Sequence, residues 1–527
     1  SPGAVFHFRL VLLGRPGTPS RLSAKENKES FGLSQMGQNT SQSHGWTNPE
    51  EFNADVDELE EGVKTVVLIH GLASCALRGK TYGARGFLSD YCRQACASHE
   101  AADERLLYVS ISELAKRPHI VKSLALNWEP TIAKREGSEE AQKTFKTVGG
   151  YENAEVYPVQ GLDGIRTLNP GLESDVTPIY LWHNIIEHLS EAEVNLLAFN
   201  YDWRRWGDVI YIAQLVPKFK ELMERAVYVS GEPTIVVAHS LGAQVITYMM
   251  GFLGDQWTKA HISDVVLVGP ATMGSPTVFA GYANGPSTVT HSSVLPVANF
   301  MEVRLRDVAS TWPGMLSVLP TPLDGLDTFD GQQIASSPSR SYSSRDSLAF
   351  LEDLAQCDEK EGKHWVMDEA RGLHEKSRRF LEDHDILEVK RLWEVQFHNA
   401  AMVRRAFESH VVPYLKPPNC RVHVIYTDAI DTLFKHRFQE NLYYKASFET
   451  FVPGDDTITA ASVDKMCEAW KAEGCRVFKH HAGKKHHKEL ISCPFTMKVM
   501  DTVLAGSNDS SSSEWESEDA GGCFAAG

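Results

Sequence analysis

Ser240 lies in a stretch whose residue types and spacing favour nucleophilic catalysis. A β-branched run at 235–237 predicts a short buried strand, and the apolar spacing after Gly242 predicts a helix. A sharp strand-to-helix turn at a serine is a nucleophile elbow, which exposes the hydroxyl and leaves the next backbone N–H free to bind an oxyanion. The usual pattern is G-x-S-x-G, and here Ala238 replaces the first glycine. Ser240 is therefore the candidate nucleophile, and Leu241 is a candidate oxyanion donor.

A second oxyanion donor is expected where an earlier strand ends. Residues 63–70 form an apolar pattern typical of a buried strand, and Gly71 and Leu72 follow it. In folds with a nucleophile elbow, a loop after an early strand supplies the second backbone N–H. Leu72 is the candidate donor, and Gly71 allows the backbone to approach closely. The same residues also fit an ordinary strand-to-loop turn.

A serine hydroxyl needs a general base, and the base needs an acid that holds its tautomer. The best candidate acid lies in the turn at 453–457, directly after a strand-like run at 448–452. Asp455 is the first choice for the acid and Asp456 is the second. The alternative is that this turn only caps a helix over residues 460–470.

The candidate base belongs to a cluster of histidines near the end of the chain: His480, His481, His486 and His487. A strand at 476–478 precedes the cluster, and a helix at 495–504 follows it. Because the base follows the last strand in this topology, position favours His487 or His486. We expect one histidine to act as the base and the others to be exposed. The cluster also fits a metal-binding or basic patch, although companion carboxylates or thiolates are missing at ligand spacing.

The composition is that of an ordinary globular chain of 527 residues, with 42% hydrophobic and 23% charged side chains. A formal net charge of −17 argues against nucleic acid as a partner and against broad docking on anionic membranes. No apolar run reaches the roughly 18–20 residues that span a bilayer. The nine cysteines have neither the density of a disulfide scaffold nor the spacing of a zinc site.

Strand and helix patterns alternate along the chain, and this order positions the candidate residues. Further buried-strand patterns are found at 194–201, 262–270 and 421–426. Helical patterns are found at 179–192 and 211–228. The alternation predicts an α/β fold with a mostly parallel, doubly wound sheet. A serine elbow followed by an acid and then a histidine is typical of the α/β-hydrolase fold.

Irregular stretches predict how the chain is divided. A polar lead-in at 1–60 and a Ser-, Glu- and Gly-rich tail at 507–527 are expected to be disordered. The hydrolase domain is expected over 61–506. Two irregular regions are expected to be insertions into it, a lid at about 73–159 and a cap at about 271–418.

In this order, the motifs resemble the lecithin:cholesterol acyltransferase family, which includes phospholipid:diacylglycerol acyltransferases and lysosomal-type phospholipase A2 relatives. The resemblance covers about residues 65–504 and is weak in the lid and the cap. It rests on 161–163 (GLD), 201–204 (YDWR), 239–242 (HSLG), 268–270 (VGP), 274–276 (GSP), 312–320, 422–426, 454–457 (GDDT) and 466–470 (MCEAW). YDWR followed by GDDT is specific, although a structural role is the better expectation for Asp202 and Arg204 themselves.

Motif by motif, the resemblance implies Ser240 as nucleophile, Asp455 as acid, His487 as base, and Leu72 and Leu241 as oxyanion donors. It implies an O-acyltransferase that moves a fatty acyl group from a glycerophospholipid to a sterol or diacylglycerol through a serine acyl-enzyme, without a metal or soluble cofactor. It also implies work at a membrane or lipid-particle surface, in the endoplasmic reticulum or secretory pathway. Two alternatives stay open: a phospholipase or lipase that uses water as acceptor, and a non-catalytic lipid-binding protein.

The chain departs from the family pattern at several positions. Ala238 replaces the first elbow glycine, and His70 replaces the proline usual before the oxyanion-loop glycine. Cys467 matches one cysteine of the family's disulfide near the acid, but Val424 stands where its partner is expected. A lid disulfide from Cys75 to Cys92 or Cys96 would require an oxidising compartment.

Overall fold

The computed structural model describes residues 58–80, 104–108, 124–134, 141–150, 155–168, 180–284, 308–323, 326–327, 329–356, 399–439, 442 and 446–506. All of them belong to one compact unit, Thr47–Gly527. Nearly all of the predicted lead-in, the predicted tail, and Cys92 and Cys96 lie outside the described residues. At the end of the lead-in, the Glu60 backbone hydrogen-bonds with the Asn195 side chain through both its N–H (2.9 Å) and its carbonyl (2.8 Å).

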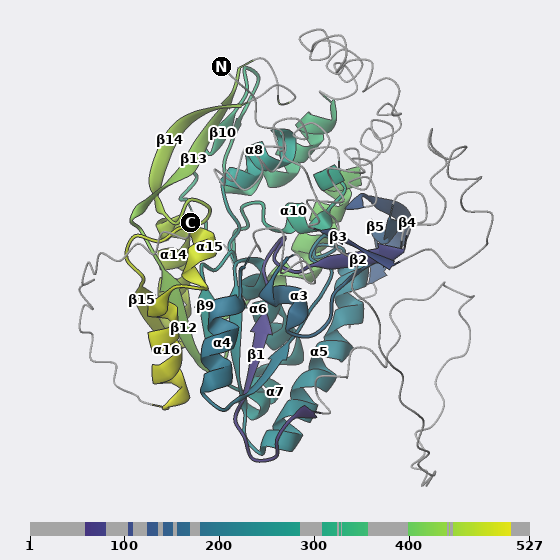
Figure 1. The fold of residues 1–527 in the computed structure, drawn as a ribbon. Helices are drawn as coiled ribbons and strands as arrows, with labels where there is room; N and C mark the ends of the chain where they lie inside the picture. The colour runs from purple at the N-terminus through teal and green to yellow at the C-terminus, as the bar shows by residue number, and fades with distance from the viewer. Residues whose placement is uncertain are drawn as a thin grey trace, which may run out of the picture. The chain divides into compact units, whose positions relative to one another are not determined.

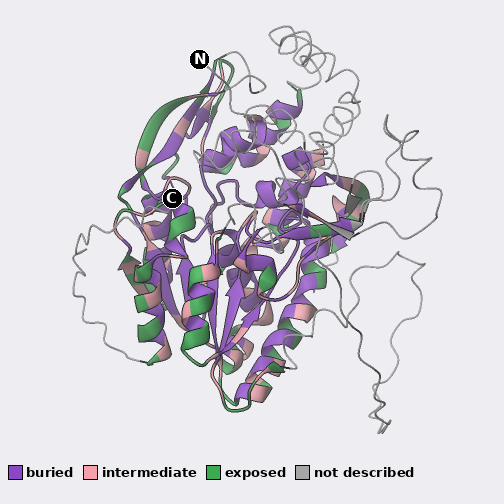
Figure 2. Ribbon diagram, in the orientation of Figure 1, coloured by how far each residue is buried: buried purple, intermediate pink, exposed green. Residues whose placement is uncertain are grey.

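A six-stranded sheet forms the centre of this unit (Figure 1). In spatial order its strands are β15 (Arg476–His481), β12 (Arg421–Tyr426), β9 (Ile262–Val268), β8 (Thr234–His239), β1 (Thr65–Ile69) and β7 (Asn195–Ala198). Every pairing among them is parallel. All residues of β1 and β8 are buried, as expected for a parallel sheet that is covered on both faces (Figure 2). The six predicted core strands are confirmed.

Helices cover both faces of this sheet (Figure 1). They are α4 (His183–Glu191), α5 (Val209–Ser230), α6 (Leu241–Leu253), α7 (Asp255–His261), α14 (Ala460–Ala472) and α16 (Pro494–Leu504). α4 packs against α16, whereas α7 packs against both α5 and α6, so the two groups form separate layers. A parallel sheet wound on both faces, with a serine between β8 and α6, is the predicted α/β-hydrolase fold.

A second sheet carries the loop of the candidate acid. Its strands, in spatial order, are β11 (Ser341–Tyr342), β10 (Ala335–Ser336), β13 (Ile430–Phe438) and β14 (Ala446–Gly454). β13 and β14 form an antiparallel hairpin in which Ile430 pairs with Gly454. The strand predicted at 448–452 therefore exists, but it lies outside the central sheet.

The described residues of the predicted lid form antiparallel strands where the sequence pattern is irregular. β2 (Leu77–Lys80), β3 (Glu104–Tyr108) and β6 (Glu155–Pro158) make one small sheet, and β4 (Leu126–Lys134) and β5 (Ala141–Gly150) make a hairpin. Most of β4 is exposed or half-buried, so it lacks the apolar run of a core strand. The short helix α3 (Asp163–Arg166) follows.

The described residues of the predicted cap are mainly helical. They form α8 (Thr277–Asn284), α10 (Pro313–Ser317), the 3₁₀ helices η5 (Ser344–Asp346) and η6 (Val412–Tyr414), and helical segments at 347–356 and 399–410. α15 (His487–Leu490) lies in the histidine cluster. None of the described helices is long and apolar enough to cross a membrane. Cys75 and Cys467 are buried free thiols in the structure.

Candidate active site

Ser240 lies in the turn between β8 and α6, where its backbone has φ 56° and ψ −120°. A non-glycine residue rarely adopts a positive φ, and such strain is typical of a nucleophile elbow. The Ser240 N–H donates to the Val268 carbonyl (3.0 Å), and the Ser240 carbonyl accepts from the Ala271 N–H (3.1 Å). These two bonds, to the last residue of β9 and to the loop after it, hold the turn in its strained form.

Small residues on either side of Ser240 let α6 approach β1. A Cβ added at Gly242 would lie 2.5 Å from the Ile69 carbonyl oxygen, so no side chain fits there. Ala238 is fully buried and pairs in register with Ile69 on one side and Leu267 on the other. The sheet thus accommodates the methyl group that replaces the usual first glycine.

Asp455 and His487 form a buried pair in which 3% and 9% of their surfaces are exposed. Nδ1 of His487 lies 2.8 Å from Oδ2 of Asp455, and the His487 backbone N–H donates to the Asp455 carbonyl (2.7 Å). An ionised carboxylate only accepts hydrogen bonds, so Nδ1 carries the hydrogen and Nε2 of the neutral ring does not. Nε2 is buried and has no hydrogen-bond partner among the described residues. This protonation pattern is that of a general base.

The loop after β14 orients the Asp455 carboxylate. Oδ1 accepts hydrogen bonds from the backbone N–H groups of Thr457 (3.0 Å) and Ile458 (2.6 Å), which leaves Oδ2 for the histidine. The Asp456 N–H donates to the Thr432 hydroxyl on β13 (2.9 Å). The role of Thr432 could not be predicted from the sequence, because this hydrogen bond joins β13 to the loop after β14, across 24 residues of chain.

The second-choice residues also pair with each other. Nδ1 of His486 lies 2.6 Å from Oδ2 of Asp456, but this pair faces solvent, with the two side chains 50% and 26% exposed. The structure therefore forms both Asp–His pairs, and only the pair of Asp455 and His487 is buried.

The first two histidines of the cluster have other contacts. Nε2 of His480 lies 3.1 Å from Nδ1 of His423, and Nε2 of His481 lies 2.7 Å from Oδ1 of Asp428. The expectation of exposed side chains is right for His481 and His486 but wrong for His480, which is half-buried. Within the described ranges, no group of three or more His, Cys, Asp or Glu side chains is placed to hold a metal ion.

His239, the residue before Ser240, connects the base to the elbow. Its Nε2 donates to the His487 carbonyl (3.1 Å), and the two ring centroids lie 4.8 Å apart. A Cβ added at Gly269, which has φ 51°, would lie 2.9 Å from Nδ1 of His487. Gly269 directly follows Val268, which accepts the Ser240 N–H. The elbow and the Asp–His pair thus meet around the end of β9.

The surroundings of these two histidines shift their pKa values in opposite directions. Burial alone would lower the pKa of His487, but the charge and hydrogen bond of Asp455 and the charge of Asp456 raise it above 6.5. Burial, followed by the charge of His487, lowers the pKa of His239 to about 3. His487 is therefore the histidine that gains a proton more readily than in water.

Both predicted oxyanion donors lie near Ser240. Leu241 is the first residue of α6, so its N–H has no carbonyl partner within the helix. A Cβ added at Gly71 would lie 2.8 Å from the Cβ of Ser240, so the loop that continues to Leu72 lies against the elbow. The Ser74 N–H closes this loop by donating to the Gly71 carbonyl (3.3 Å).

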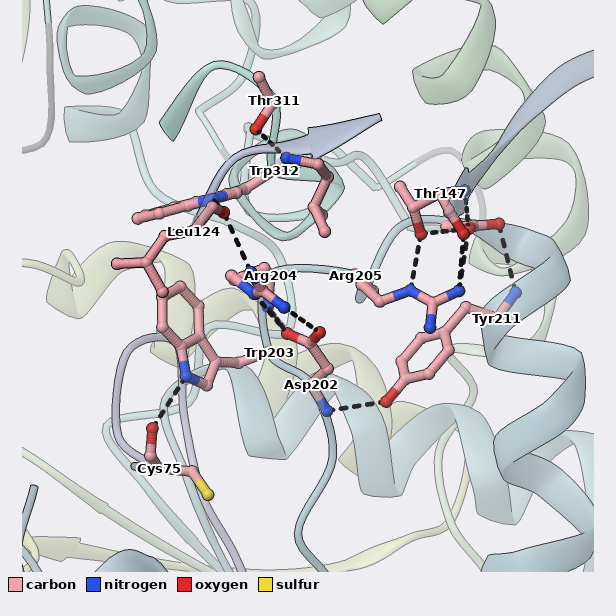
Figure 3. A network of polar contacts seen from close by, with 12 residues as sticks. Cys75, Leu124, Thr147, Asp202, Trp203, Arg204, Arg205, Tyr211, Thr311 and Trp312 are labelled. Carbon is pink, nitrogen blue, oxygen red and sulfur yellow. Dashed lines mark hydrogen bonds and ion pairs between the residues drawn. The ribbon is translucent and has the colours of Figure 1, made fainter. Parts of the chain in front are cut away.

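The YDWR loop after β7 makes structural contacts (Figure 3). Arg204 and Asp202 form a buried two-point ion pair, with Nε–Oδ1 2.9 Å and Nη2–Oδ2 2.6 Å. Arg204 Nη1 also donates to the Leu124 carbonyl (3.0 Å), and Trp203 Nε1 donates to the Cys75 carbonyl (3.0 Å). The structural role expected for Asp202 and Arg204 agrees with these contacts.

The next residues of this loop extend the network to β5 (Figure 3). Arg205 Nε donates to the Thr147 hydroxyl (2.7 Å), and Asp208 Oδ2 accepts from both the N–H (2.6 Å) and the hydroxyl (2.7 Å) of Thr147. Asp208 Oδ1 caps α5 by accepting the Ile210 N–H (2.9 Å). These contacts fix the loop that follows β7 to the β4–β5 hairpin.

Comparisons with known proteins place this arrangement in context. The family model described as lecithin:cholesterol acyltransferase matches residues 143–501, more than half of the chain. The phospholipid:diacylglycerol acyltransferase of Schizosaccharomyces pombe is 24% identical over 28% of this chain and 26% of its own length. The lysosomal phospholipase A and acyltransferase of Bos taurus is 25% identical over 33% of this chain and 40% of its own length. The matched segments thus span less than half of these relatives.

Among solved structures, the crystal structure of an esterase mutant aligns with 72% of this chain and 97% of its own chain. The sequence identity is 10% and the TM-score is 0.29.

Proposed function

Because this chain belongs to the lecithin:cholesterol acyltransferase family, we propose that it is a lipid O-acyltransferase with Ser240 as nucleophile, Asp455 as acid and His487 as base. The proposed donor is a glycerophospholipid, and the proposed acceptor is the hydroxyl of a sterol or diacylglycerol. The names of the matched relatives, phospholipid:diacylglycerol acyltransferase and lysosomal phospholipase A and acyltransferase, support this substrate class. The observation that carries the proposal is the buried Asp455–His487 pair beside the strained serine elbow.

In the first half of the reaction, Oγ of Ser240 attacks the ester carbonyl of the phospholipid while Nε2 of His487 accepts its proton. Asp455 stabilises the imidazolium through the hydrogen bond to Nδ1. The N–H groups of Leu72 and Leu241 stabilise the oxyanion of the tetrahedral intermediate. His487 then returns the proton to the leaving oxygen, which releases a lysophospholipid and leaves the acyl group on Ser240.

In the second half, the acceptor hydroxyl gives its proton to Nε2 of His487 and attacks the acyl-enzyme carbonyl. Collapse of the second tetrahedral intermediate breaks the bond to Ser240 Oγ and returns the proton to it. The route uses protein side chains and backbone N–H groups. Its lipid substrates imply that the protein works at a membrane or lipid-particle surface.

The second candidate function is a phospholipase, in which water resolves the same acyl-enzyme. The name of the bovine relative, which includes phospholipase A, favours this candidate. Phospholipid with a labelled acyl chain, supplied with or without a sterol or diacylglycerol, distinguishes the two. Labelled ester that forms only with an added alcohol supports the transferase, and labelled free fatty acid at an unchanged rate supports the phospholipase.

Labelling with a fluorophosphonate probe tests the nucleophile. We expect the wild-type protein to be labelled and Ser240→Ala to lose labelling, because the probe bonds to the activated serine. Ser339→Ala, a change at an exposed serine, is the control and should label like the wild type. Labelling that persists in Ser240→Ala would overturn the assignment. An unlabelled, correctly folded wild type would favour the non-catalytic alternative.

A further inference from the structure

His70 and Tyr201 form a buried pair beside the loop that carries Leu72. Both side chains are fully buried, and their rings stack with centroids 4.3 Å apart and planes 9° apart. Burial raises the pKa of the Tyr201 phenol, which stays protonated and donates to the His70 carbonyl (2.9 Å). The ring and the backbone of His70 are therefore both held in place.

Two hydrogen bonds define the tautomer of His70. The Tyr201 backbone N–H donates to Nε2 of His70 (3.3 Å), so Nε2 is an acceptor and carries no hydrogen. Burial lowers the pKa of His70 to about 4, so the ring is neutral near pH 7. The single hydrogen is then on Nδ1, which donates to the Gly71 carbonyl (2.9 Å).

The bond from His70 fixes the peptide group that carries the proposed oxyanion donor. In a trans peptide, the carbonyl oxygen of one residue and the N–H of the next point in opposite directions. Holding the Gly71 oxygen therefore sets the direction of the Leu72 N–H. The Ser74 N–H gives the same oxygen a second hydrogen bond (3.3 Å).

Position 71 has to be glycine, so the peptide group after it depends on hydrogen bonds from other residues to keep its orientation. Its close approach to Ser240 leaves no room for a Cβ, which would lie 2.8 Å from the Ser240 Cβ. Glycine adopts many backbone conformations at low cost, so the peptide group that follows a glycine flips more readily than one that follows another residue. A flip of this peptide group by about 180° would reverse the direction of the Leu72 N–H and break both hydrogen bonds to the Gly71 oxygen.

We propose that His70 is a positioning residue for the oxyanion hole, and that its Nδ1–H holds the Gly71–Leu72 peptide in the orientation that binds the oxyanion. The inference rests on the proposed serine mechanism.

Three substitutions at His70 distinguish the contribution of Nδ1 from that of Nε2. Asn places an amide nitrogen near the position of Nδ1 and retains the donor to Gly71, whereas Gln places its amide near Nε2 and Ala has neither group. We expect His70→Ala and His70→Gln to lower kcat for p-nitrophenyl butyrate by about 100-fold, as for loss of one oxyanion donor, with KM unchanged. His70→Asn should stay within about tenfold of the wild type, because the required donor remains.

Two further measurements separate positioning from general stability. Affinity for a trifluoromethyl ketone, whose adduct carries an oxyanion, should fall with kcat across the three variants. The pH at half-maximal kcat/KM should not move, since His487 is unchanged.

Tyr201→Phe, which keeps the stacked ring but loses the bond to the His70 carbonyl, should show a smaller loss of kcat in the same direction.

Equal activity of the Asn and Gln variants would overturn the inference, as would an Ala variant that loses only thermal stability. If the Ala variant does not fold, the comparison of Asn with Gln still decides. A wild type whose Ser240 is not labelled by fluorophosphonate would overturn the proposed function, and this inference with it. An active, labelled wild type with an unaffected His70→Ala variant would overturn this inference alone.

Discussion

At the scale of single residues, the site contains two neighbouring Asp–His pairs with the same chemical groups and different surroundings. The Asp455–His487 pair is buried, whereas the Asp456–His486 pair faces solvent. An ion pair with the protonated histidine is stronger where water is excluded, so only the buried pair strongly stabilises the imidazolium. The position of Asp455 next to Gly454 favoured it over Asp456 in the sequence. His487 and His486 were not separated, because the sequence of two adjacent histidines does not show which one is buried.

Asn substitutions at the two aspartates are predicted to have very different effects. Asp455→Asn should lower kcat/KM by about 10³–10⁴-fold, because the neutral amide neither holds the Nδ1–H tautomer nor stabilises the charged ring. Asp456→Asn, the matched control, should change it by less than about tenfold, since an exposed pair contributes little. Hydrolysis of p-nitrophenyl butyrate measures both. Comparable losses would assign the acid's role to the loop as a whole rather than to Asp455.

The raised pKa of His487 predicts the pH dependence of the reaction. As the proposed base, His487 can accept a proton only when Nε2 carries none, so kcat/KM should be low in acid and rise with pH. Because the pKa is raised, the midpoint of that rise should lie above pH 6.5. The charge of Asp456 contributes to the rise in pKa, so Asp456→Asn should move the midpoint to lower pH. A midpoint below 6.5 in the wild type, or an upward shift in the variant, would contradict this assignment.

At the scale of elements, the loop after β7 is the junction that joins the core to the strands before it in the chain. Its side chains hydrogen-bond to backbone groups of Cys75, Leu124 and Thr147, which belong to three separate segments (Figure 3). Arg204 and Asp202 can both be buried in this loop because each compensates the charge of the other. These residues of the loop thus hold three separate segments together.

Removal of Arg204 is predicted to destabilise the fold strongly. Arg204→Met leaves the Asp202 carboxylate buried without its partner, which should lower the free energy of unfolding by about 3–5 kcal/mol. The double variant Asp202→Asn/Arg204→Met should recover part of this loss. Lys146→Ala, which breaks the exposed pair with Glu129, is the control and should cost at most about 1 kcal/mol. Urea unfolding measures all three, and an equal cost for the exposed and buried pairs would contradict the prediction.

Elements with continuous apolar runs could be predicted from the sequence, and elements stabilised by distant partners could not. The strands β1 and β8 are buried throughout, so their sequences contain an unbroken apolar signal. β13 includes Lys435, His436 and Arg437, so it lacks this signal. A strand was predicted at 448–452, within β14, but most of β14 is exposed and its pairing with β13 was not predicted. Its pairing joins segments whose contact depends on register, which periodicity alone does not define.

At the scale of the whole molecule, the proposed catalytic groups come from segments spread along the chain. The family match begins at residue 143, yet β1, which precedes it, pairs with both β7 and β8 in the central sheet. The segment before the match therefore supplies a central strand and Leu72. The prediction placed the candidate serine, acid and histidine in that order along the chain, but not the candidate acid, Asp455, at the end of a strand of a second sheet.

The attachment of Asp455 to the β13–β14 hairpin has a thermodynamic consequence. This hairpin belongs to a different sheet from β15, the strand that precedes His487. Proteins open locally in cooperative units, and a peripheral unit can open while a core sheet stays closed. Each opening of the hairpin that withdraws Asp455 would separate it from His487 without melting the parallel sheet. The fraction of molecules in which Asp455 and His487 are paired is then set by the local opening equilibrium of the hairpin rather than by global unfolding.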